Sequence, residues 1–392
     1  MSPELAKPGT SGLTAPMTAR FLFIANGNGE DSIAAEIISR LPAGHVADAY
    51  PVVGQGRAYE GLAPLVGPRF DIPSEGWRHT RGSVARDVRG GMLSSIRPAL
   101  SFLRSARGRY DKVVVVGDNV GPILCLLAGL PIDVYLDVFK SGFAHTYSAP
   151  ERWLIRRTCK TVFTRDAMLA ETLSRAGIDA RAAGNVMLDT TTYSQYDAVA
   201  RRTRPLAVTL LPGSRATTGE SLALQVDALR QLPPDLRPDI FVAVAGGIAP
   251  TTLAQATGLT HRLPSSGEIA DLGTLVGDGL TLHLATGVTG NLIEASDMVL
   301  SQAGTATQQA LGLGRPVITF DRPDNRRKRM ADEQALMGES RELVPQDATA
   351  LATATARLLS DSAERTRRGE IGAERLGPFG AAAKIVQRLL EP

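Results

Sequence analysis

Short apolar runs that end in a glycine-containing turn and lead into a helix-like stretch recur along this chain. The first unit has its apolar run at residues 20–25 and its turn at 26–32, and a run of four valines lies at 113–116. Further runs follow at 132–136 and 161–164. Strands that alternate with helices form a parallel sheet, because each helix carries the chain back to the same end of the sheet. The first half of the chain is therefore predicted to be an α/β domain.

A second series of the same kind begins after a polar stretch at residues 193–205, which is the best candidate for a linker. Its strands are expected at 206–211, 240–245, 280–284, 298–300 and 316–320. Because 392 residues exceed the size of one ordinary core, the sequence predicts two facing Rossmann-like domains with a cleft between them.

The pattern divides the chain into four parts. Residues 1–19 are rich in Pro, Gly, Ser and Thr without an apolar segment, and we expect a disordered leader rather than a signal peptide. Residues 20–200 form the predicted N-terminal domain and residues 205–377 the C-terminal domain. Residues 378–392 are expected to form a helix that packs back on the N-terminal domain.

The overall composition is that of an ordinary globular protein. Hydrophobic residues make up 43% of the chain and charged residues 21%, and the net charge of +3 gives no reason to expect a nucleic acid partner. The longest apolar run, at 123–130, is too short to cross a bilayer. Cys125 and Cys159 lack ligand spacing and the five histidines are scattered, so we expect a reduced, cytoplasmic protein without a metal site.

The stretch 301–320 joins a turn of small residues to the start of a helix and then to a buried strand. Such a turn at Gly304 exposes backbone N–H groups that can bind an anion. Thr305 and Thr307 can donate hydroxyl hydrogen bonds to a phosphate or a ribose. Gln308 and Gln309 can reach a ribose or sugar hydroxyl. The alternative is a plain helix cap without a ligand.

A second turn of this type follows the apolar run at 208–211, where Gly213 precedes Ser214 and Arg215. An arginine binds a diphosphate through bidentate hydrogen bonds that lysine cannot reproduce. Two turns at the carboxyl ends of parallel strands can hold one phosphorylated ligand between them. An isolated loop arginine can also be merely solvated.

The turn at residues 26–31 places Asn26, Gly27 and Gly29 ahead of two carboxylates, Glu30 and Asp31. The glycines allow a tight turn or a close approach of a ligand. Acidic residues at a helix start also favour the helix dipole without any ligand, so a capping turn stays an open alternative. The third glycine of a dinucleotide fingerprint is missing, which argues against dinucleotide binding.

Asp118 follows the four valines, at the sheet edge where ligands of doubly wound folds bind. Its carboxylate can act as a general base toward an acceptor hydroxyl, or it can simply cap the following helix. The sequence contains neither a phosphate-binding G-x-x-x-x-G-K-[ST] loop nor a G-x-S-x-G nucleophile turn.

Residues 92–109 combine apolar side chains at helical spacing with four arginines. This segment can rest on an anionic membrane surface or can face the protein core with a basic edge.

Taken in order, these motifs resemble those of the lipid-A-disaccharide synthase-related proteins, which are glycosyltransferases of the GT-B architecture. The resemblance runs from about Phe21 to about Lys384. The segments that carry it are 26–35, 51–59, 116–118, 140–141, 150–153, 163–166, 184–185, 210–215 and 303–316.

This resemblance implies an inverting, metal-independent transferase that takes a sugar from a nucleotide diphosphate donor, UDP-linked, and needs no cofactor. The N-terminal domain would bind the acceptor, through the 26–31 turn, Lys140 and Ser141, and the C-terminal domain would bind the donor. Asp118 is then the base candidate, while the donor-binding residues are Ser214, Arg215, Gly304, Thr305, Thr307, Gln308 and Gln309. The acceptor would be a lipid or a small molecule, and the family relation to lipid A assembly favours a lipid at the inner membrane face, with peripheral membrane contact.

The sequence departs from this family at two places. Gln308 and Gln309 replace an acid at the start of the helix, and a basic stretch at 321–329 replaces a glycine-rich loop. Two other functions stay open: a UDP-sugar epimerase, although its usual acidic and histidine-rich constellation is missing, and a non-catalytic nucleotide-sugar-binding protein. The oligomeric state is not predicted by the sequence.

Overall fold

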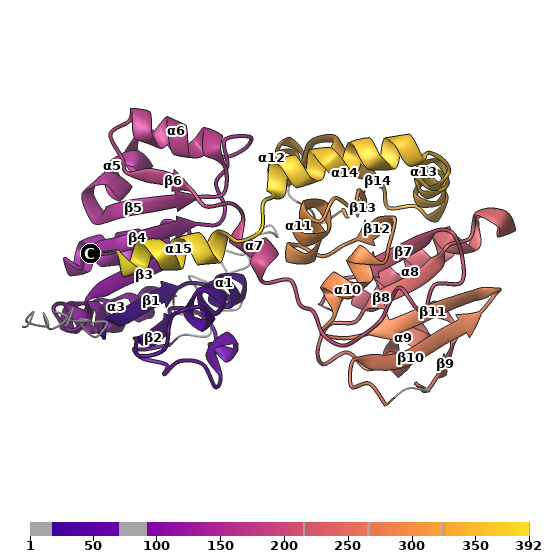
Figure 1. Ribbon diagram of the computed structural model, residues 1–392, viewed down its shortest axis with the longest axis horizontal. Helices are drawn as coiled ribbons and strands as arrows, with labels where there is room; N and C mark the ends of the chain where they lie inside the picture. The colour runs from indigo at the N-terminus through magenta and orange to yellow at the C-terminus, as the bar shows by residue number, and fades with distance from the viewer. Residues whose placement is uncertain are drawn as a thin grey trace, which may run out of the picture.

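The computed structural model describes residues 18–69, 92–214, 216–264, 267–323, 325 and 327–391, and it describes only the backbone of Asn28 and residues 92–95. These residues form two α/β domains, each built on one sheet with helices against it (Figure 1). The predicted fold class, two Rossmann-like α/β domains, is confirmed. All but the last two residues of the predicted leader lie outside the described residues.

The N-terminal sheet has six parallel strands in the order β2-β1-β3-β4-β5-β6. The strands are β1 (Arg20–Ala25), β2 (Val46–Pro51), β3 (Lys112–Gly117), β4 (Ile132–Asp137), β5 (Cys159–Thr164) and β6 (Ala180–Ala182). The helical segments are α1 (Asn28–Ser39), η1 (Arg57–Tyr59), α3 (Met92–Ala106), α4 (Val120–Ala128), α5 (Ala149–Thr158), α6 (Ala167–Arg175) and α7 (Val186–Asp189).

Alternate residues of β1 enter the two cores of this domain. Phe21 and Phe23 pack with α1 on one face, while Leu22 and Ile24 pack with α3 to α6 on the other. All four side chains are buried, so both faces of the strand are covered. This explains why the strand is a continuous apolar run instead of an alternating one.

The C-terminal sheet has eight strands in the order β14-β13-β12-β7-β8-β11-β10-β9. The strands are β7 (Ala207–Leu211), β8 (Asp239–Ala243), β9 (Thr260–Arg262), β10 (Asp271–Gly277), β11 (Leu280–Ala285), β12 (Met298–Ser301), β13 (Val317–Asp321) and β14 (Arg341–Pro345). The strands are parallel except that β10 pairs antiparallel with both β9 and β11. The helical segments are α8 (Thr218–Arg230), η2 (Pro234–Leu236), α9 (Pro250–Thr257), α10 (Thr289–Glu294), α11 (Thr305–Gly312), α12 (Arg327–Met337), η3 (Gly338–Ser340), α13 (Ala348–Ser360) and α14 (Ser362–Leu376).

Each sheet reverses its strand order at one point. In the N-terminal sheet β1 lies between β2 and β3, so the chain leaves β1 in one direction and returns on its other side. In the C-terminal sheet β7 lies between β8 and β12 in the same way. Ligands of open α/β sheets bind at such switch points, outside the carboxyl ends of the two strands. The turns that follow β1, β3, β7 and β12 are therefore the candidate ligand-binding turns.

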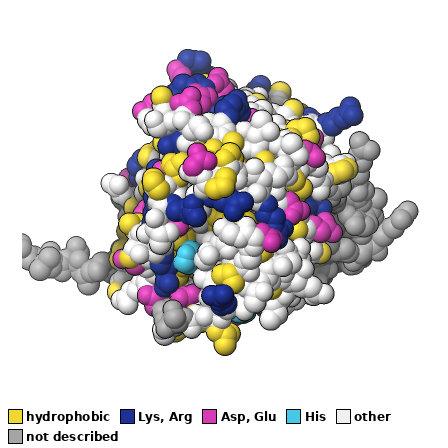
Figure 2. Space-filling model, turned by 90° about the vertical axis from the view of Figure 1, so that its right-hand side faces the viewer, with side chains coloured by type: hydrophobic (Ala, Val, Ile, Leu, Met, Phe, Trp, Pro, Cys, Tyr) yellow, Lys and Arg dark blue, Asp and Glu magenta, His cyan; other side chains and the backbone are white. Residues whose placement is uncertain are grey.

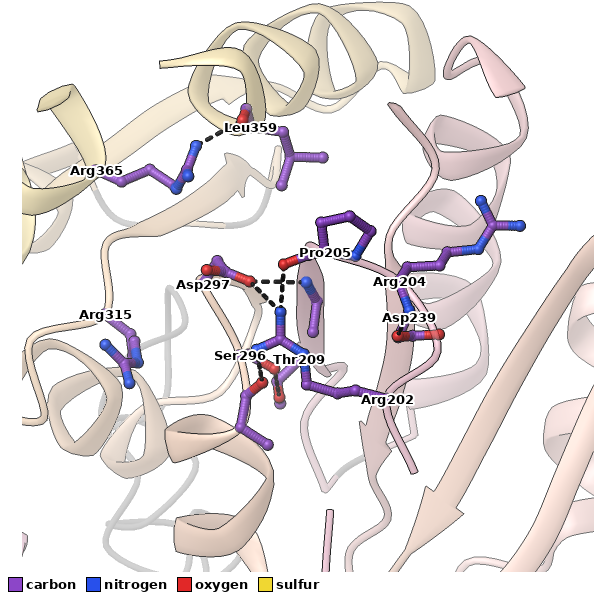
Figure 3. Close-up of polar contacts among 12 residues, drawn as sticks. Arg202, Arg204, Pro205, Thr209, Asp239, Ser296, Asp297, Arg315, Leu359 and Arg365 are labelled. Carbon is purple, nitrogen blue, oxygen red and sulfur yellow. Dashed lines mark hydrogen bonds and ion pairs between the residues drawn. The ribbon is translucent and has the colours of Figure 1, made fainter. Parts of the chain in front are cut away.

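Residues 193–205 lie along the C-terminal domain instead of hanging free. Arg202 Nη2 donates to Asp297 Oδ2 over 3.2 Å and to the Pro205 carbonyl over 2.5 Å, and Asp297 also accepts from the Ala207 backbone (Figure 3). The Tyr193 hydroxyl donates a hydrogen bond to Glu294 Oε1 over 2.7 Å. The polar composition of this stretch thus reflects specific contacts with the domain that follows it.

The final helix, α15 (Ala381–Leu390), returns to the N-terminal domain (Figure 1). Its Ala382, Ile385 and Leu389 side chains are buried in the same core as Phe21. Asp189 caps the start of the helix, because its carboxylate accepts from the Gly380 and Ala382 backbone N–H groups over 2.6 and 2.7 Å. The N-terminal domain is therefore built from two separate parts of the sequence.

The structure defines the place of two segments whose role the sequence left open, namely α3 and the basic stretch 321–329. Ala99, Leu103 and Ala106 of α3 are buried in the N-terminal core, so the described part of this helix faces the protein interior. The basic stretch 321–329 ends in the first turn of α12, where Arg329 forms an ion pair with Glu333 over 2.7 Å.

Basic and acidic side chains are interspersed on the end of the C-terminal domain (Figure 2). Many of the charges of this domain are paired, as in the 2.8 Å contact between Arg230 and Asp278. Within the described residues, none of the helices has the length and apolar character that a membrane crossing needs.

Candidate functional site

The switch point of the N-terminal sheet is bridged by Asn26, which follows β1, and Asp118, which follows β3. Asn26 Nδ2 donates to Asp118 Oδ1 over 2.7 Å, and the Val120 backbone N–H donates to the same oxygen over 2.9 Å. Asp118 is half-buried, and its Oδ2 forms no hydrogen bond with any described residue. Asp118 therefore caps the start of α4 with one oxygen and keeps the other available.

Gly117 makes this bridge possible. Its φ is +137°, and a Cβ placed on it would lie 2.1 Å from Asn26 Oδ1. A larger residue would push the amide away from Asp118, so the turn between β3 and α4 needs glycine here.

Glu30 lies beside this bridge at the start of α1. Its side chain folds back over Gly27, where a Cβ would meet Glu30 Oε2 at 2.4 Å. Burial, together with the nearby charge of Asp118, raises the pKa of Glu30. Gly29, in contrast, is exposed and has no heavy atom within 4 Å of a Cβ position. The Glu30 and Asp118 carboxylates are therefore neighbours at the carboxyl ends of β1 and β3.

Asp31 points into the domain instead of toward the other carboxylates. It is buried and accepts a hydrogen bond from the Tyr59 hydroxyl over 3.1 Å, while its Oδ2 is buried without a hydrogen-bond partner among the described residues. Burial raises the pKa of Asp31 to about 7, with a smaller contribution from Glu30. Asp31 therefore holds its proton more tightly than an exposed aspartate does.

Lys140 is connected to the Asp118 turn through Glu151. Glu151 Oε1 accepts from Lys140 Nζ over 2.9 Å and from Asn119 Nδ2 over 2.6 Å. Burial opposes the ionisation of Glu151, but hydrogen bonds from Lys140 and Ser148 outweigh it and lower the pKa of Glu151 to about 2. The Lys140 ammonium is thus held in place as part of an ion pair.

Ser141 is buried and orders the loop after β4, since its Oγ accepts from the Phe143 backbone over 3.1 Å. This loop reaches the C-terminal domain. The Arg375 guanidinium lies 4.7 Å from the centre of the Phe143 ring, and His145 Nε2 lies 2.7 Å from Asp332 Oδ2. The loop after β4 therefore contacts α12 and α14 of the C-terminal domain.

At the C-terminal switch point, the turns after β7 and β12 lie side by side. Gly213 has a φ of +100°, and a Cβ on it would lie 3.6 Å from the Gln302 carbonyl oxygen. Ser214 and Gly304 are exposed at the two turns. Arg215 lies outside the described residues.

The start of α11 presents free backbone N–H groups. Its N-cap is Gly304, which has no side chain that could satisfy them, and Thr305 is exposed. Thr307, in contrast, is buried, and its hydroxyl contacts Ser301 Oγ over 2.6 Å and the Ala303 carbonyl over 2.5 Å. Thr307 therefore braces the turn, while the helix start itself can bind an anion.

Gln308 and Gln309 both reach the N-terminal domain. Gln308 Oε1 accepts from Arg165 Nη2 over 3.1 Å and from Asn185 Nδ2 over 3.4 Å. Gln309 Nε2 donates to the Met187 carbonyl over 3.0 Å and to Thr190 Oγ1 over 3.2 Å. A carboxylate could not donate these last two bonds, which accounts for an amide at position 309.

Arg165, at the end of β5, was not among the predicted site residues. It is 6% exposed, and within the described residues no carboxylate forms an ion pair with it. Two signals in the sequence point to it: it lies in the 163–166 segment of the family resemblance, and it directly follows a buried strand, where a charged residue is unusual.

No group of three or more His, Cys, Asp or Glu side chains is placed to hold a metal ion in the part of the chain that the structure describes.

The fold is shared with solved structures of low sequence identity. S. aureus MnaA in its co-structure with UDP is 12% identical and has a TM-score of 0.59, and the match covers 95% of this chain and 96% of that one. Acinetobacter baumannii MurG is 15% identical with a TM-score of 0.57, over 94% and 98% of the two chains. A UDP-N-acetylglucosamine 2-epimerase is 14% identical with a TM-score of 0.56, over 95% and 96%.

The chain has the GT-B fold. No protein-family model matches the sequence, and no curated protein sequence matches it.

Proposed function

We propose that this chain is a glycosyltransferase, which moves a sugar from a nucleoside diphosphate donor, UDP-linked, to an acceptor hydroxyl with inversion and without a metal ion. The observation that carries the proposal is the chemistry at the two switch points. At the C-terminal switch point, the start of α11 has no side-chain cap and lies beside the glycine-containing turn after β7. At the N-terminal switch point, Asp118 keeps one carboxylate oxygen without a hydrogen bond to any described residue. The UDP co-structure of MnaA, a protein of the same fold, supports the choice of nucleotide.

On the donor side, the N–H groups at the start of α11 would bind the diphosphate. Negative charge builds on the leaving nucleoside diphosphate as the glycosidic bond breaks, and fixed donors stabilise that charge most in the transition state. Ser214, Thr305 and the Arg215 expected from the sequence would add hydrogen bonds from the neighbouring turns. Thr307 would not contact the donor itself; its hydroxyl contact with Ser301 would hold the turn in the shape that binds the diphosphate.

On the acceptor side, Asp118 Oδ2 would take the proton of the attacking hydroxyl. Asn26 fixes the carboxylate through the other oxygen, so the orientation of Oδ2 is set before the acceptor binds. The hydroxyl oxygen then attacks the anomeric carbon from the side opposite the leaving group, which inverts its configuration. Lys140 and Ser141 would order the acceptor-side loop instead of reacting themselves.

A lipid acceptor, and with it peripheral contact with the cytoplasmic face of the inner membrane, is part of the proposal. It is supported by the resemblance of the sequence motifs to lipid-A-disaccharide synthase-related proteins, and the structure adds no separate argument for it. The donor-side chemistry does not depend on the nature of the acceptor.

A UDP-sugar epimerase is the second candidate, because Glu30 and Asp118 bring two carboxylates together and an epimerase shares the fold. The test is to measure UDP release from a panel of UDP-sugars, with and without lipid and small-molecule acceptors. A transferase should release UDP at a high rate only when an acceptor is present, whereas a hydrolysing epimerase should do so from the donor alone. Tight donor binding without turnover would instead indicate a non-catalytic binding protein.

Nucleotide choice is measured separately by calorimetric titration with UDP, GDP and dTDP. Wild type should bind UDP best, and Arg215→Ala should bind it more weakly. No binding of any nucleotide would exclude the transferase and the epimerase together.

A further inference from the structure

Arg165 combines a full charge with a buried position and an incomplete set of partners. Its polar contacts with the described residues all use one nitrogen: Nη2 donates to the Val138 carbonyl over 2.9 Å and to Gln308 Oε1 over 3.1 Å, and it lies 3.9 Å from Met187 Sδ. Nε is buried without a hydrogen-bond partner among the described residues. A guanidinium has five N–H donors, so much of its bonding capacity is unused.

The missing counterion makes this arrangement costly. Burial lowers the pKa of Arg165, and the charges of Asp137 and Asp166 oppose this only in part. Both of these carboxylates already accept other bonds: Asp137 from the Phe139 backbone over 2.7 Å, and Asp166 from the Leu169 backbone over 2.8 Å. A buried cation without a close anion is destabilising unless a ligand supplies the charge.

Two donors of the N-terminal domain converge on one oxygen of the C-terminal domain. Arg165 Nη2 and Asn185 Nδ2 both point at Gln308 Oε1, which is the acceptor of a neutral amide. An anionic oxygen would accept the same two bonds more strongly, because bonds between charged partners are roughly twice as strong as neutral ones.

This oxygen lies close to the proposed donor site. Gln308 is three residues after Thr305, which corresponds to about 4.5 Å along the axis of α11. The uncapped N–H groups of this helix and the Arg165 guanidinium therefore belong to one region of the domain interface.

We propose that Arg165 and Asn185 form a phosphate-binding site of the N-terminal domain, and that a phosphoryl oxygen of a ligand replaces Gln308 Oε1 there. The ligand is either the nucleoside diphosphate donor or a phosphorylated acceptor, since both carry the same group. The donor case rests on the proposed function, whereas the phosphate site itself does not.

The test measures binding of four probes by calorimetric titration: UDP, uridine, inorganic pyrophosphate and decyl phosphate. Arg165→Gln removes the charge, and Asn185→Asp keeps the acceptor that caps α7 but removes the donor. Each should weaken the binding of at least one phosphate-bearing probe by about 10-fold or more and leave uridine unchanged. Loss confined to UDP and pyrophosphate assigns the site to the donor, and loss confined to decyl phosphate assigns it to the acceptor.

Two further variants separate binding from structure. Arg175→Gln removes an exposed arginine of the neighbouring helix α6 and should bind all probes as wild type does. Gln308→Ala should tighten phosphate binding a few-fold, because its oxygen no longer competes. Where Arg165→Gln does not fold, Arg165→Lys keeps the charge and should retain more phosphate affinity than Asn185→Asp.

The proposal is overturned if folded Arg165→Gln binds every probe within twofold of wild type, or if it loses uridine as strongly as UDP. Wild type that binds pyrophosphate or decyl phosphate through Arg165, but no nucleotide, would support the phosphate site and refute the transferase proposal. Acceptor-dependent turnover by wild type, together with unchanged binding of every phosphate-bearing probe in Arg165→Gln, would support the transferase proposal and refute the phosphate site. No binding of any probe by wild type would refute both.

Discussion

Asn26 and Asp118 are 92 positions apart in the sequence, yet Asn26 Nδ2 lies 2.7 Å from Asp118 Oδ1. The two residues follow adjacent strands whose connections run in opposite directions, so only this sheet order brings them together. The bond fixes one oxygen of the carboxylate, and the other forms no hydrogen bond with any described residue. This is the arrangement that a general base requires.

Asp118→Asn should lower turnover by about 100-fold or more and leave UDP affinity nearly unchanged. The amide oxygen can still accept from Asn26 and Val120, so the turn should keep its shape. The measurement is kcat from UDP release together with a UDP titration. Asp347→Asn, which replaces another helix-capping carboxylate, is the matched control. Turnover within threefold of wild type would remove Asp118 from the mechanism.

Asp31→Asn should flatten the pH dependence of stability. The pKa of Asp31 is raised to about 7 in the folded chain, so the folded state holds a proton that the unfolded state has released above about pH 4. The free energy of unfolding of wild type therefore falls as the pH rises from about 4 to 7. Relative to wild type, the variant should gain about 1–3 kcal/mol between pH 5 and pH 8.

Urea unfolding at the two pH values checks this prediction for Asp31. Glu60→Gln, which replaces an exposed carboxylate next to Tyr59, should show the same pH dependence as wild type. An Asp31→Asn curve parallel to that of wild type would mean that Asp31 is ionised throughout.

Gln309→Glu should destabilise the chain by about 1–3 kcal/mol, because the new carboxylate faces the Met187 carbonyl that the amide now binds. Urea unfolding measures the change. Gln231→Glu is the control, since Gln231 makes a similar bond to the Asp227 carbonyl but is exposed. An unchanged stability with tighter UDP binding would show that residue 309 serves the nucleotide instead of the domain contact.

Gly213→Ala should weaken UDP binding several-fold, because an alanine at a φ of +100° costs about 1–2 kcal/mol and displaces the turn after β7. Gly44→Ala introduces the same kind of strain at a φ of +99°, with no heavy atom within 4 Å of a Cβ position, between α1 and β2 of the N-terminal domain. Both variants should lose stability, but only the first should lose affinity in a UDP titration. Equal UDP affinities would place the nucleotide elsewhere.

The central strands could be predicted from the sequence because they are buried on both faces and read as unbroken apolar runs. The predicted run at residues 20–25 coincides with β1, and the four valines lie within β3. The strand β6 was missed, since it has three residues and none of them is buried. The strand β10 was missed because it alternates buried and half-buried residues and contains an irregular register opposite β11.

The separate turns of the candidate site could also be read from the sequence, but their connections could not. Glycines and polar residues after apolar runs pointed to the turns at Asp118 and Gly304. The contact between Arg165 and Gln308, in contrast, joins residues 143 positions apart in different domains. No periodicity or local spacing records such a contact, because it depends on how the two domains meet.

Because of helix α15, folding of the N-terminal domain can be completed only after the C-terminal domain has been synthesised. Its Ile385 and Leu389 fill part of the core beneath β1, although they are separated from that strand by the whole C-terminal domain. During synthesis the N-terminal sheet must therefore wait, with the part of one apolar face that α15 covers still open, until more than 170 further residues of chain, on the order of ten seconds of translation, have been made. A chaperone that shields this face, or early folding of the C-terminal domain, would protect the half-built domain from aggregation.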